Sequence, residues 1–131
     1  MGISVRQPKE QQIESVYKLA CLTAQQITEV PLKIEKVQIN DQYIGDGYGL
    51  PTEGTLDAIK LIAKTEGILL DPVYSGKGLD GMIGMIKHNS HYREKDMVFL
   101  HTGGSIALFA YGEQLAASLV KCVNKVRSLT T

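Results

Sequence analysis

Apolar residues recur at helical spacing in four stretches of the chain, and the stretches predict four amphipathic helices. The first begins near Pro8, which suits the first turn of a helix, and ends before Pro31. The second is capped by Thr52 or Thr55 and stopped by Gly67. The stripes consist of Ile13, Val16, Tyr17, Ala20, Ala24 and Ile27; Leu56, Ile59, Ile62 and Ala63; Leu79, Met82, Ile83 and Ile86; and Leu108, Tyr111, Leu115, Leu119, Cys122 and Val126.

Four short runs between these helices carry strand patterns. "GISVR" (2–6) is strand-like, and "LKIEKVQI" (32–39) alternates with period two, which predicts a strand with one exposed face. "ILLDPVY" (68–74) and "MVFLH" (97–101) are nearly continuous apolar runs, typical of strands buried in a parallel sheet. The alternation of strands and helices predicts an α/β fold with a mostly parallel sheet flanked by helices.

Glycine turns follow the two buried runs. The carboxyl ends of parallel strands lie at one edge of the sheet, where such sheets bind ligands. We therefore expect the two turns to be neighbours at that edge. The first, at 76–81, matches G-x-G-x-x-G. A dinucleotide site would need an acidic residue about 20 residues later, at the end of the next strand. His101 and Thr102 occupy that place, so dinucleotide binding is disfavoured. The alternative is that the glycines let a strand turn sharply into a closely packed helix.

Composition narrows the class of protein. The 131 residues have the length of one domain, and 44% of them are hydrophobic, which is ordinary for a globular protein. Lys plus Arg and Asp plus Glu balance at 14 each, which argues against nucleic acid or an anionic membrane as partner. No apolar run approaches the roughly 20 residues of a spanning helix, and no signal peptide is visible, so we expect a cytoplasmic location. Cys21 and Cys122 lack metal-site or redox-pair spacing and are expected to be buried thiols, and His88 and His91 are expected at the surface.

Two long segments carry a family resemblance. "YGLPTEGTLDAIKLIAKTEGILLDPVYSGKGLDGMI" followed by "FLHTGGSIALFAY" closely resembles the pyridoxal-phosphate enzymes that comprise 1-aminocyclopropane-1-carboxylate deaminase and D-cysteine desulfhydrase. These enzymes have the tryptophan-synthase-β-like fold, fold type II. The resemblance starts at "GISVRQPKE" and runs nearly to the end of the chain, but it covers only the C-terminal part of family members.

The resemblance implies that residues 1–131 are the C-terminal portion of the large domain that binds pyridoxal phosphate. In the family, the lysine that binds the cofactor covalently and the loop that grips its phosphate both lie upstream. The implied partners are a small amino-acid substrate and either a second copy of the enzyme or the missing N-terminal part. A sheet cut partway exposes a strand edge, so we expect the isolated chain to associate.

The resemblance also implies a set of site residues. Tyr74 would lie beside the cofactor, with Tyr48 across the substrate, and Thr102, Gly103 and Ser75 would contact the cofactor. A phenol can carry a proton at the substrate carbon if a neighbouring cation or hydrogen bond lowers its pKa. A threonine hydroxyl can donate a hydrogen bond to a neutral pyridine nitrogen. The alternative for each tyrosine is a buried ring with a satisfied hydroxyl.

Two positions favour one branch of the family. The cyclopropane deaminases have glutamate after the tyrosine of "DPVY" and the turn "HLGG", whereas this chain has Ser75 and Thr102. Both differences favour elimination of sulfide from D-cysteine; the alternatives are the cyclopropane deaminase and a non-catalytic fragment. Lys77 is expected in the first turn of a helix without neighbours that desolvate it, and so not as the lysine that binds the cofactor. Asp71 is expected to be a turn or cap residue rather than an acid or base.

Overall fold

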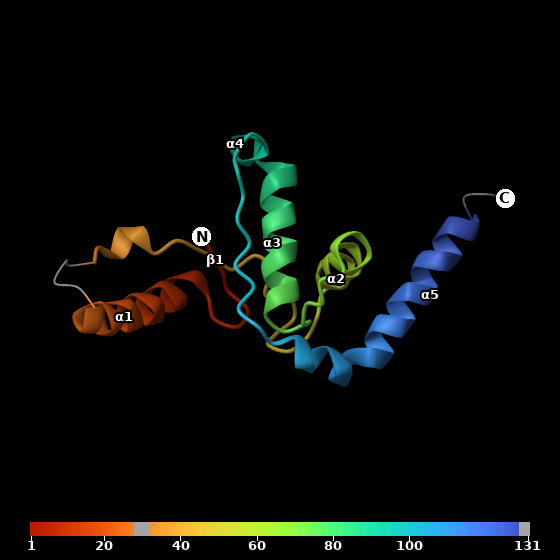
Figure 1. Cartoon of the computed structure of the whole chain (residues 1–131), viewed down its shortest axis with the longest axis horizontal. Coiled ribbons are helices and arrows are strands. Elements are labelled where there is room, and N and C mark those ends of the chain that lie inside the picture. Colours follow the sequence, from red (N-terminus) through yellow and green to blue (C-terminus); the bar gives the residue numbers. More distant parts are fainter. Residues whose placement is uncertain (28–31, 129–131) are drawn as a thin grey trace.

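Helices dominate the architecture (Figure 1). The computed structural model describes residues 1–27 and 32–128, with side chains described as far as residue 120. The helices are α1 (Lys9–Ile27), α2 (Glu53–Glu66), α3 (Ser75–His88), α4 (Ser90–Arg93) and α5 (Gly112–Ser128), with 3-10 helices η1 (Ile34–Lys36) and η2 (Ser105–Tyr111). Strands β1 (Gly2–Ile3) and β2 (Ile39–Asn40) pair in parallel, with Gly2 opposite Ile39. The fold is therefore of the mixed α/β class, helix-rich with parallel strands, as the sequence predicts.

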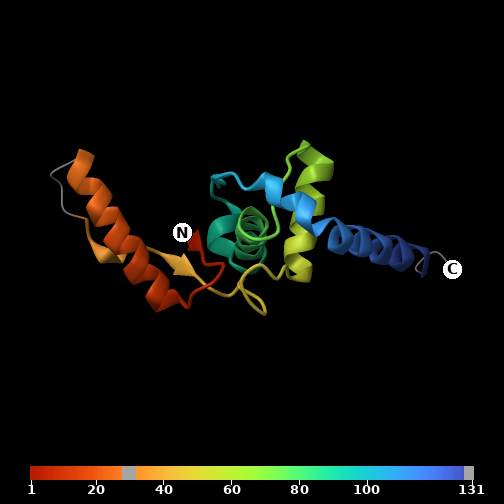
Figure 2. The same cartoon turned by 90° about the horizontal axis from the view of Figure 1, so that it is seen from below.

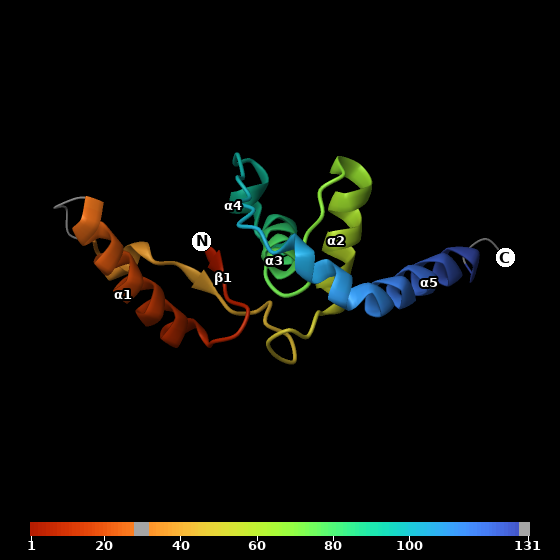
Figure 3. The same cartoon turned by 60° about the horizontal axis from the view of Figure 1, so that its bottom comes forward.

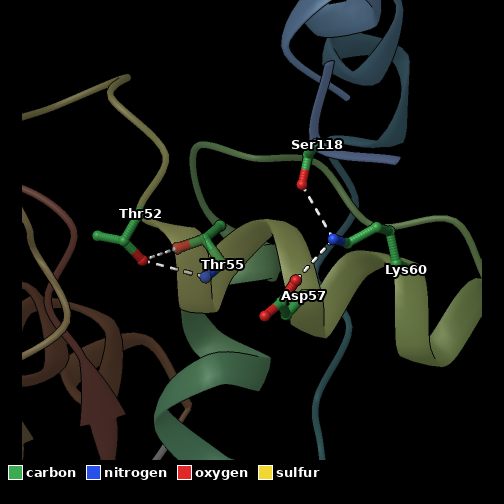
Figure 4. Close-up of polar contacts among 5 residues, drawn as sticks. All are labelled: Thr52, Thr55, Asp57, Lys60 and Ser118. Atoms are coloured by element: carbon green, nitrogen blue, oxygen red, sulfur yellow. Dashed lines mark hydrogen bonds and ion pairs between the residues drawn. The ribbon is translucent and has the colours of Figure 1, made fainter. Parts of the chain in front are cut away.

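Local signals fix the ends of α2. The Thr52 hydroxyl accepts a hydrogen bond from the Thr55 amide at 3.0 Å and lies 2.8 Å from the Thr55 hydroxyl (Figure 4). At the other end, Gly67 adopts a left-handed conformation with φ of 67°, and its amide donates to the Ala63 carbonyl. The predicted cap and stop of this helix are thus confirmed. The predicted helices after Pro8, after residue 74 and near the C-terminus are also present, while Pro31 lies outside the described residues.

Two predicted buried strands are wrong. Residues 68–71 and 97–101 form no strand, and their apolar side chains are exposed at Ile68, Leu69, Val98 and Leu100. Val98 reaches 90% exposure. A strand exists only when a neighbouring backbone pairs with it, and in the described ranges no strand lies beside either segment.

The predicted strand over residues 32–39 is mostly wrong as well. The Val37 amide donates to the Ile34 carbonyl, and the Lys36 amide to the Lys33 carbonyl, so this stretch satisfies its backbone locally as η1. Only Ile39 and Asn40 reach β1 and pair with it. The alternating pattern thus forms a strand only where β1 supplies a partner.

The core lies between α2 and α3, which pack side by side (Figure 2). Its buried members are Ala58 and Ile59 of α2, Leu79 of α3 and Leu70 from the segment that joins them. Partly buried side chains surround it: Ile62, Met82, Ile83, Phe99, Leu108 and Leu115. The site described below lies on this α2–α3 core.

Helices α1 and α5 project from the α2–α3 core in opposite directions (Figures 1 and 3). No residue of α1 is buried, so the expected packing of its apolar stripe is not seen, and Cys21 is only partly buried. The Cys122 side chain lies outside the described part. Lys60 of α2 holds α5 by donating to the Ser118 hydroxyl at 2.9 Å, and it also pairs with Asp57 (Figure 4).

Exposed apolar side chains between residues 98 and 109 predict that the isolated chain self-associates. Val98, Leu100, Ile106 and Phe109 are all 79–90% exposed, and burying them against another chain is favourable. Sedimentation velocity is expected to show associating species. Replacing Val98 and Leu100 with serine should reduce association without changing helix content. The control, Lys64→Ser with Glu66→Ser on exposed positions of α2, should leave association unchanged. A wild-type chain that sediments as a single monomeric species and unfolds cooperatively would contradict this expectation.

Candidate functional site

Tyr48 and Tyr74 contact each other at the amino end of α3. Tyr48 comes from the loop between β2 and α2, and Tyr74 directly precedes α3, 26 residues later in the chain. Their hydroxyls are hydrogen-bonded, and their ring centroids lie 5.8 Å apart in an edge-to-face arrangement at 66°. The Arg6 guanidinium lies 5.8 Å from the centre of the Tyr48 ring, within range of a cation–π contact. Both tyrosines remain about half exposed, so a ligand can reach them.

The environment raises the pKa of Tyr74. The main cause is the hydrogen bond with the Tyr48 hydroxyl, followed by burial and the nearby Asp71 charge, while Arg6 acts in the opposite direction. This direction is opposite to the lowered pKa that the sequence analysis required of a phenol that delivers or accepts a proton. Tyr74 therefore stays protonated over a wider pH range, as a proton donor must.

Asp71 organises the turn that carries Tyr74. Its buried carboxylate accepts hydrogen bonds from the Val73 and Tyr74 amides at 2.8 and 2.7 Å. The other oxygen accepts from the Ser75 amide at 2.9 Å and from the Ser75 hydroxyl at 2.5 Å. Burial alone would raise the pKa of Asp71, but the hydrogen bonds, those of Ser75 foremost, outweigh it and lower the pKa. Asp71 is thus an ionised cap at the start of α3, as expected from the sequence.

The second glycine turn lies against the same carboxylate. Gly104 has φ of 89°, and a Cβ on it would stand 2.8 Å from the nearer Asp71 oxygen. The Ser105 hydroxyl donates to the Leu69 carbonyl at 2.8 Å, which fastens the turn to the segment before Asp71. The second glycine turn therefore lies beside residues 69–71, which precede the first. Thr102, just before this turn, is exposed.

A cavity of about 630 Å³ brings three of the predicted site residues together. Tyr74, Ser75 and Thr102 line it, and Phe99 and Met82 form part of its apolar wall. This volume lies within the usual range of small-molecule sites, roughly 300–1,000 Å³. Tyr48 and Gly103 are not among the residues that line it. Ser75 is engaged with Asp71, so its hydroxyl serves the turn as well as the cavity wall.

The G-x-G-x-x-G motif lies inside α3, and its glycines pack closely. A Cβ on Gly76 would meet the Asp71 carbonyl at 2.7 Å, and a Cβ on Gly81 would meet Ile3 at 2.6 Å. Neither glycine has a positive φ. The structure thus favours the packing alternative over a phosphate-binding turn between a strand and a helix.

Lys77 differs most from its sequence-based expectation. Its side chain is fully buried, and its ammonium donates hydrogen bonds to the carbonyls of Ile44 and Gly47, the latter at 2.9 Å. Burial lowers the pKa of Lys77, while the Asp46 charge partly opposes this shift. The expectation that nothing desolvates this lysine is wrong, because the loop that covers it lies more than 25 residues upstream in the sequence. Arg6 was missed too, since nothing in its local sequence marks it as a neighbour of Tyr48.

Comparison of this chain with known proteins shows which family it belongs to. The sequence pattern of the pyridoxal-phosphate dependent enzymes matches residues 5–103, and the chain belongs to this family. A crystal structure of an ACC deaminase homologue is similar to it, with a TM-score of 0.74 and 28% sequence identity. The similarity covers 89% of this chain and 34% of the homologue, so the chain spans about a third of that protein's length. Pyridoxal phosphate is the cofactor of the family.

In the ranges 1–27 and 32–128, no helix is long and apolar enough to cross a membrane. The same part of the chain contains no group of three or more His, Cys, Asp or Glu side chains that could hold a metal ion.

Replacing Asp71 with asparagine is expected to destabilise the chain by about 2–3 kcal/mol, since hydrogen bonds to a charged group contribute about 1.5–3 kcal/mol. Folding lowers the Asp71 pKa, so its contribution is present above the ordinary carboxyl pKa of about 3.9 and is lost as the pH falls through the lowered value. Urea unfolding at pH 7 and at about pH 3 measures both effects.

The matched control for this measurement is Asp57→Asn, because Asp57 is 63% exposed and forms only a surface ion pair with Lys60. Its expected cost is below about 1 kcal/mol. Equal stability of the Asp71→Asn and Asp57→Asn chains at pH 7 would show that Asp71 does not anchor the turn.

Proposed function

We propose that this chain forms one wall of the active site of a pyridoxal-phosphate lyase that converts D-cysteine and water into pyruvate, hydrogen sulfide and ammonia. The observation that carries the proposal is that Tyr74, Ser75 and Thr102 line one and the same cavity, with Tyr48 hydrogen-bonded to Tyr74. Membership of the family supports the cofactor, and Ser75 and Thr102 support the substrate class.

The cavity suits the ring of the cofactor better than its phosphate. The hydroxyls of Tyr74 and Thr102 and the apolar side chains of Phe99 and Met82 suit a flat, weakly basic aromatic ring. Among the described residues that line the cavity, none is lysine or arginine. We therefore assign the phosphate contacts and the covalent lysine to a further part of the protein, in agreement with the one-third coverage of the ACC deaminase homologue.

Thr102 would set the charge of the bound ring. When bound, pyridoxal phosphate supplies an electron sink that stabilises negative charge on the substrate. A threonine hydroxyl donates one hydrogen bond to the ring nitrogen without giving up its proton, so the nitrogen stays neutral and the sink is moderate. Loss of a thiolate needs only such a moderate sink.

Tyr74 and Tyr48 would carry the proton. The Tyr74 hydroxyl is protonated at neutral pH and lines the cavity, so it can donate toward a substrate there. The hydrogen bond to Tyr48 fixes the position of the Tyr74 hydroxyl, and after Tyr74 has donated its proton the positive charge of Arg6 favours the phenolate that remains.

A cyclopropane deaminase is the second candidate, and the similarity to the ACC deaminase homologue favours it. The two candidates differ in what the cavity must do, because opening the cyclopropane ring needs the stronger electron sink. A non-catalytic role for the chain by itself is the candidate of a different class, and it predicts a chain that folds without reacting.

The substrate assignment is tested in a longer protein that contains this chain together with the lysine that binds pyridoxal phosphate covalently. Wild type is expected to release sulfide from D-cysteine and to form little ketobutyrate from the cyclopropane amino acid. Thr102→Leu should reduce sulfide release, because it removes the threonine hydroxyl from the ring nitrogen and leaves the Ser75–Asp71 hydrogen bonds in place. A wild-type protein that prefers the cyclopropane amino acid would overturn the desulfhydrase assignment.

Tyr74→Phe, in the same longer protein, should lower the turnover of either substrate by about 10²–10⁴-fold, the usual scale for loss of a general acid or base. Tyr17→Phe is the control, because Tyr17 lies on α1 and its hydroxyl binds the Leu32 carbonyl. Equal losses in the two variants would contradict a proton-carrying role for Tyr74.

The 131-residue chain alone is expected not to bind the cofactor covalently at one lysine. Lys77 is the buried candidate, but its ammonium is engaged by two carbonyls. Incubation with pyridoxal phosphate, borohydride reduction and peptide mapping should give weak labelling spread over exposed lysines. Stoichiometric labelling of a single lysine, Lys77 in particular, would contradict this expectation.

A further inference from the structure

We propose that Lys77 is a positioning residue, whose ammonium holds the glycine-rich loop so that Tyr48 meets Tyr74. The glycine-rich loop is defined here as residues 44–49, "IGDGYG". The proposal rests on the proposed function in one respect only, that the contact between the two tyrosines serves proton transfer.

The first step is the burial of the charge. Lys77 is fully buried within the first turn of α3, where an ammonium without acceptors would be strongly disfavoured. Its acceptors are the carbonyls of Ile44 and Gly47, 33 and 30 residues away in the chain. Both belong to the glycine-rich loop, so the lysine joins α3 to that loop and to nothing nearer in sequence.

The second step is that the loop has little regular structure of its own: its local backbone hydrogen bonds run from the Ile44 amide to Asp41 and from the Leu50 amide to Gly47. Gly45 and Gly49 have φ of 69° and 76°, and the loop contains no helix or strand. Glycines lose more conformational freedom on ordering than other residues, so such a loop needs contacts from outside. The carbonyls on either side of Tyr48 receive such contacts: Gly47 from Lys77 at 2.9 Å, and Gly49 from the Tyr111 hydroxyl at 2.7 Å.

The third step is that one helical turn controls both tyrosines. Tyr74 and Lys77 lie three residues apart at the start of α3, so the element that presents Tyr74 also clamps the loop that presents Tyr48. Loss of the clamp should therefore separate the two hydroxyls while α3 stays folded, because its packing on α2 is made by other side chains.

The test uses the whole 131-residue chain with no cofactor. Lys77→Met keeps the length of the side chain and removes its donors, and Lys87→Met, at an exposed position of the same helix, is the control. Hydrogen exchange of the peptide 42–50 is expected to become about 10-fold faster or more in Lys77→Met, the scale for loss of hydrogen bonds from a charged group. Protection of α2 and α3 should stay as in wild type.

A second readout follows the tyrosine pair itself. Because the Tyr48 hydrogen bond is the main cause of the raised Tyr74 pKa, a ¹³C-tyrosine titration should show Tyr74 ionising at lower pH in Lys77→Met. Tyr111→Phe, which releases only the Gly49 carbonyl, should shift both readouts in the same direction by a smaller amount. This milder variant keeps the proposal testable if Lys77→Met fails to fold.

Two outcomes would overturn the proposal. One is unchanged exchange of residues 42–50 and unchanged Tyr74 titration in Lys77→Met. The other is equal acceleration of exchange in the loop, α2 and α3, which would assign Lys77 to the stability of the whole fold. Neither readout requires catalysis, so a positive result together with an inactive longer protein would reject only the proposed function.

Discussion

The buried carboxylate of Asp71 is the constraint on which the rest of the site depends. One oxygen binds the Val73 and Tyr74 amides and the other binds Ser75 twice, so four donors converge on one side chain. The same carboxylate faces Gly104, whose missing side chain lets the second turn approach. Asp71 thereby sets both the start of α3, which carries Tyr74, and the position of the turn that carries Thr102.

The remaining component, Tyr48, is placed by a different kind of interaction. Asp71 acts on backbone close to itself in sequence, whereas Lys77 reaches from α3 to carbonyls of a loop 30 or more residues away. Both are buried charged groups with several hydrogen-bond partners, four contacts for the Asp71 carboxylate and two for the Lys77 ammonium, and such partners are the usual condition for tolerating charge inside a protein. An anionic cap and a cationic clamp at the start of one helix therefore position Tyr74 and Tyr48.

Local patterns were sufficient to predict the helices but not the sheet. The cap by Thr52 and the stop at Gly67 depend on residues within one turn, so sequence alone placed them correctly. A strand depends on a partner that its own sequence does not specify, which is why "ILLDPVY" and "MVFLH" were assigned wrongly. The site residues came from family resemblance, whereas the burial of Lys77 and the approach of Arg6 to Tyr48 depend on tertiary contacts that no local pattern contains.

The central claim is that Thr102 of this wall presents a hydroxyl to the ring nitrogen of pyridoxal phosphate. The most direct test is ¹⁵N NMR of cofactor labelled at the ring nitrogen and bound to the longer protein, in wild type and in Thr102→Val. The account predicts the shift of an unprotonated, hydrogen-bonded nitrogen in wild type, which moves toward that of a free pyridine in Thr102→Val. A pyridinium shift in wild type, or identical shifts in the two proteins, would contradict it.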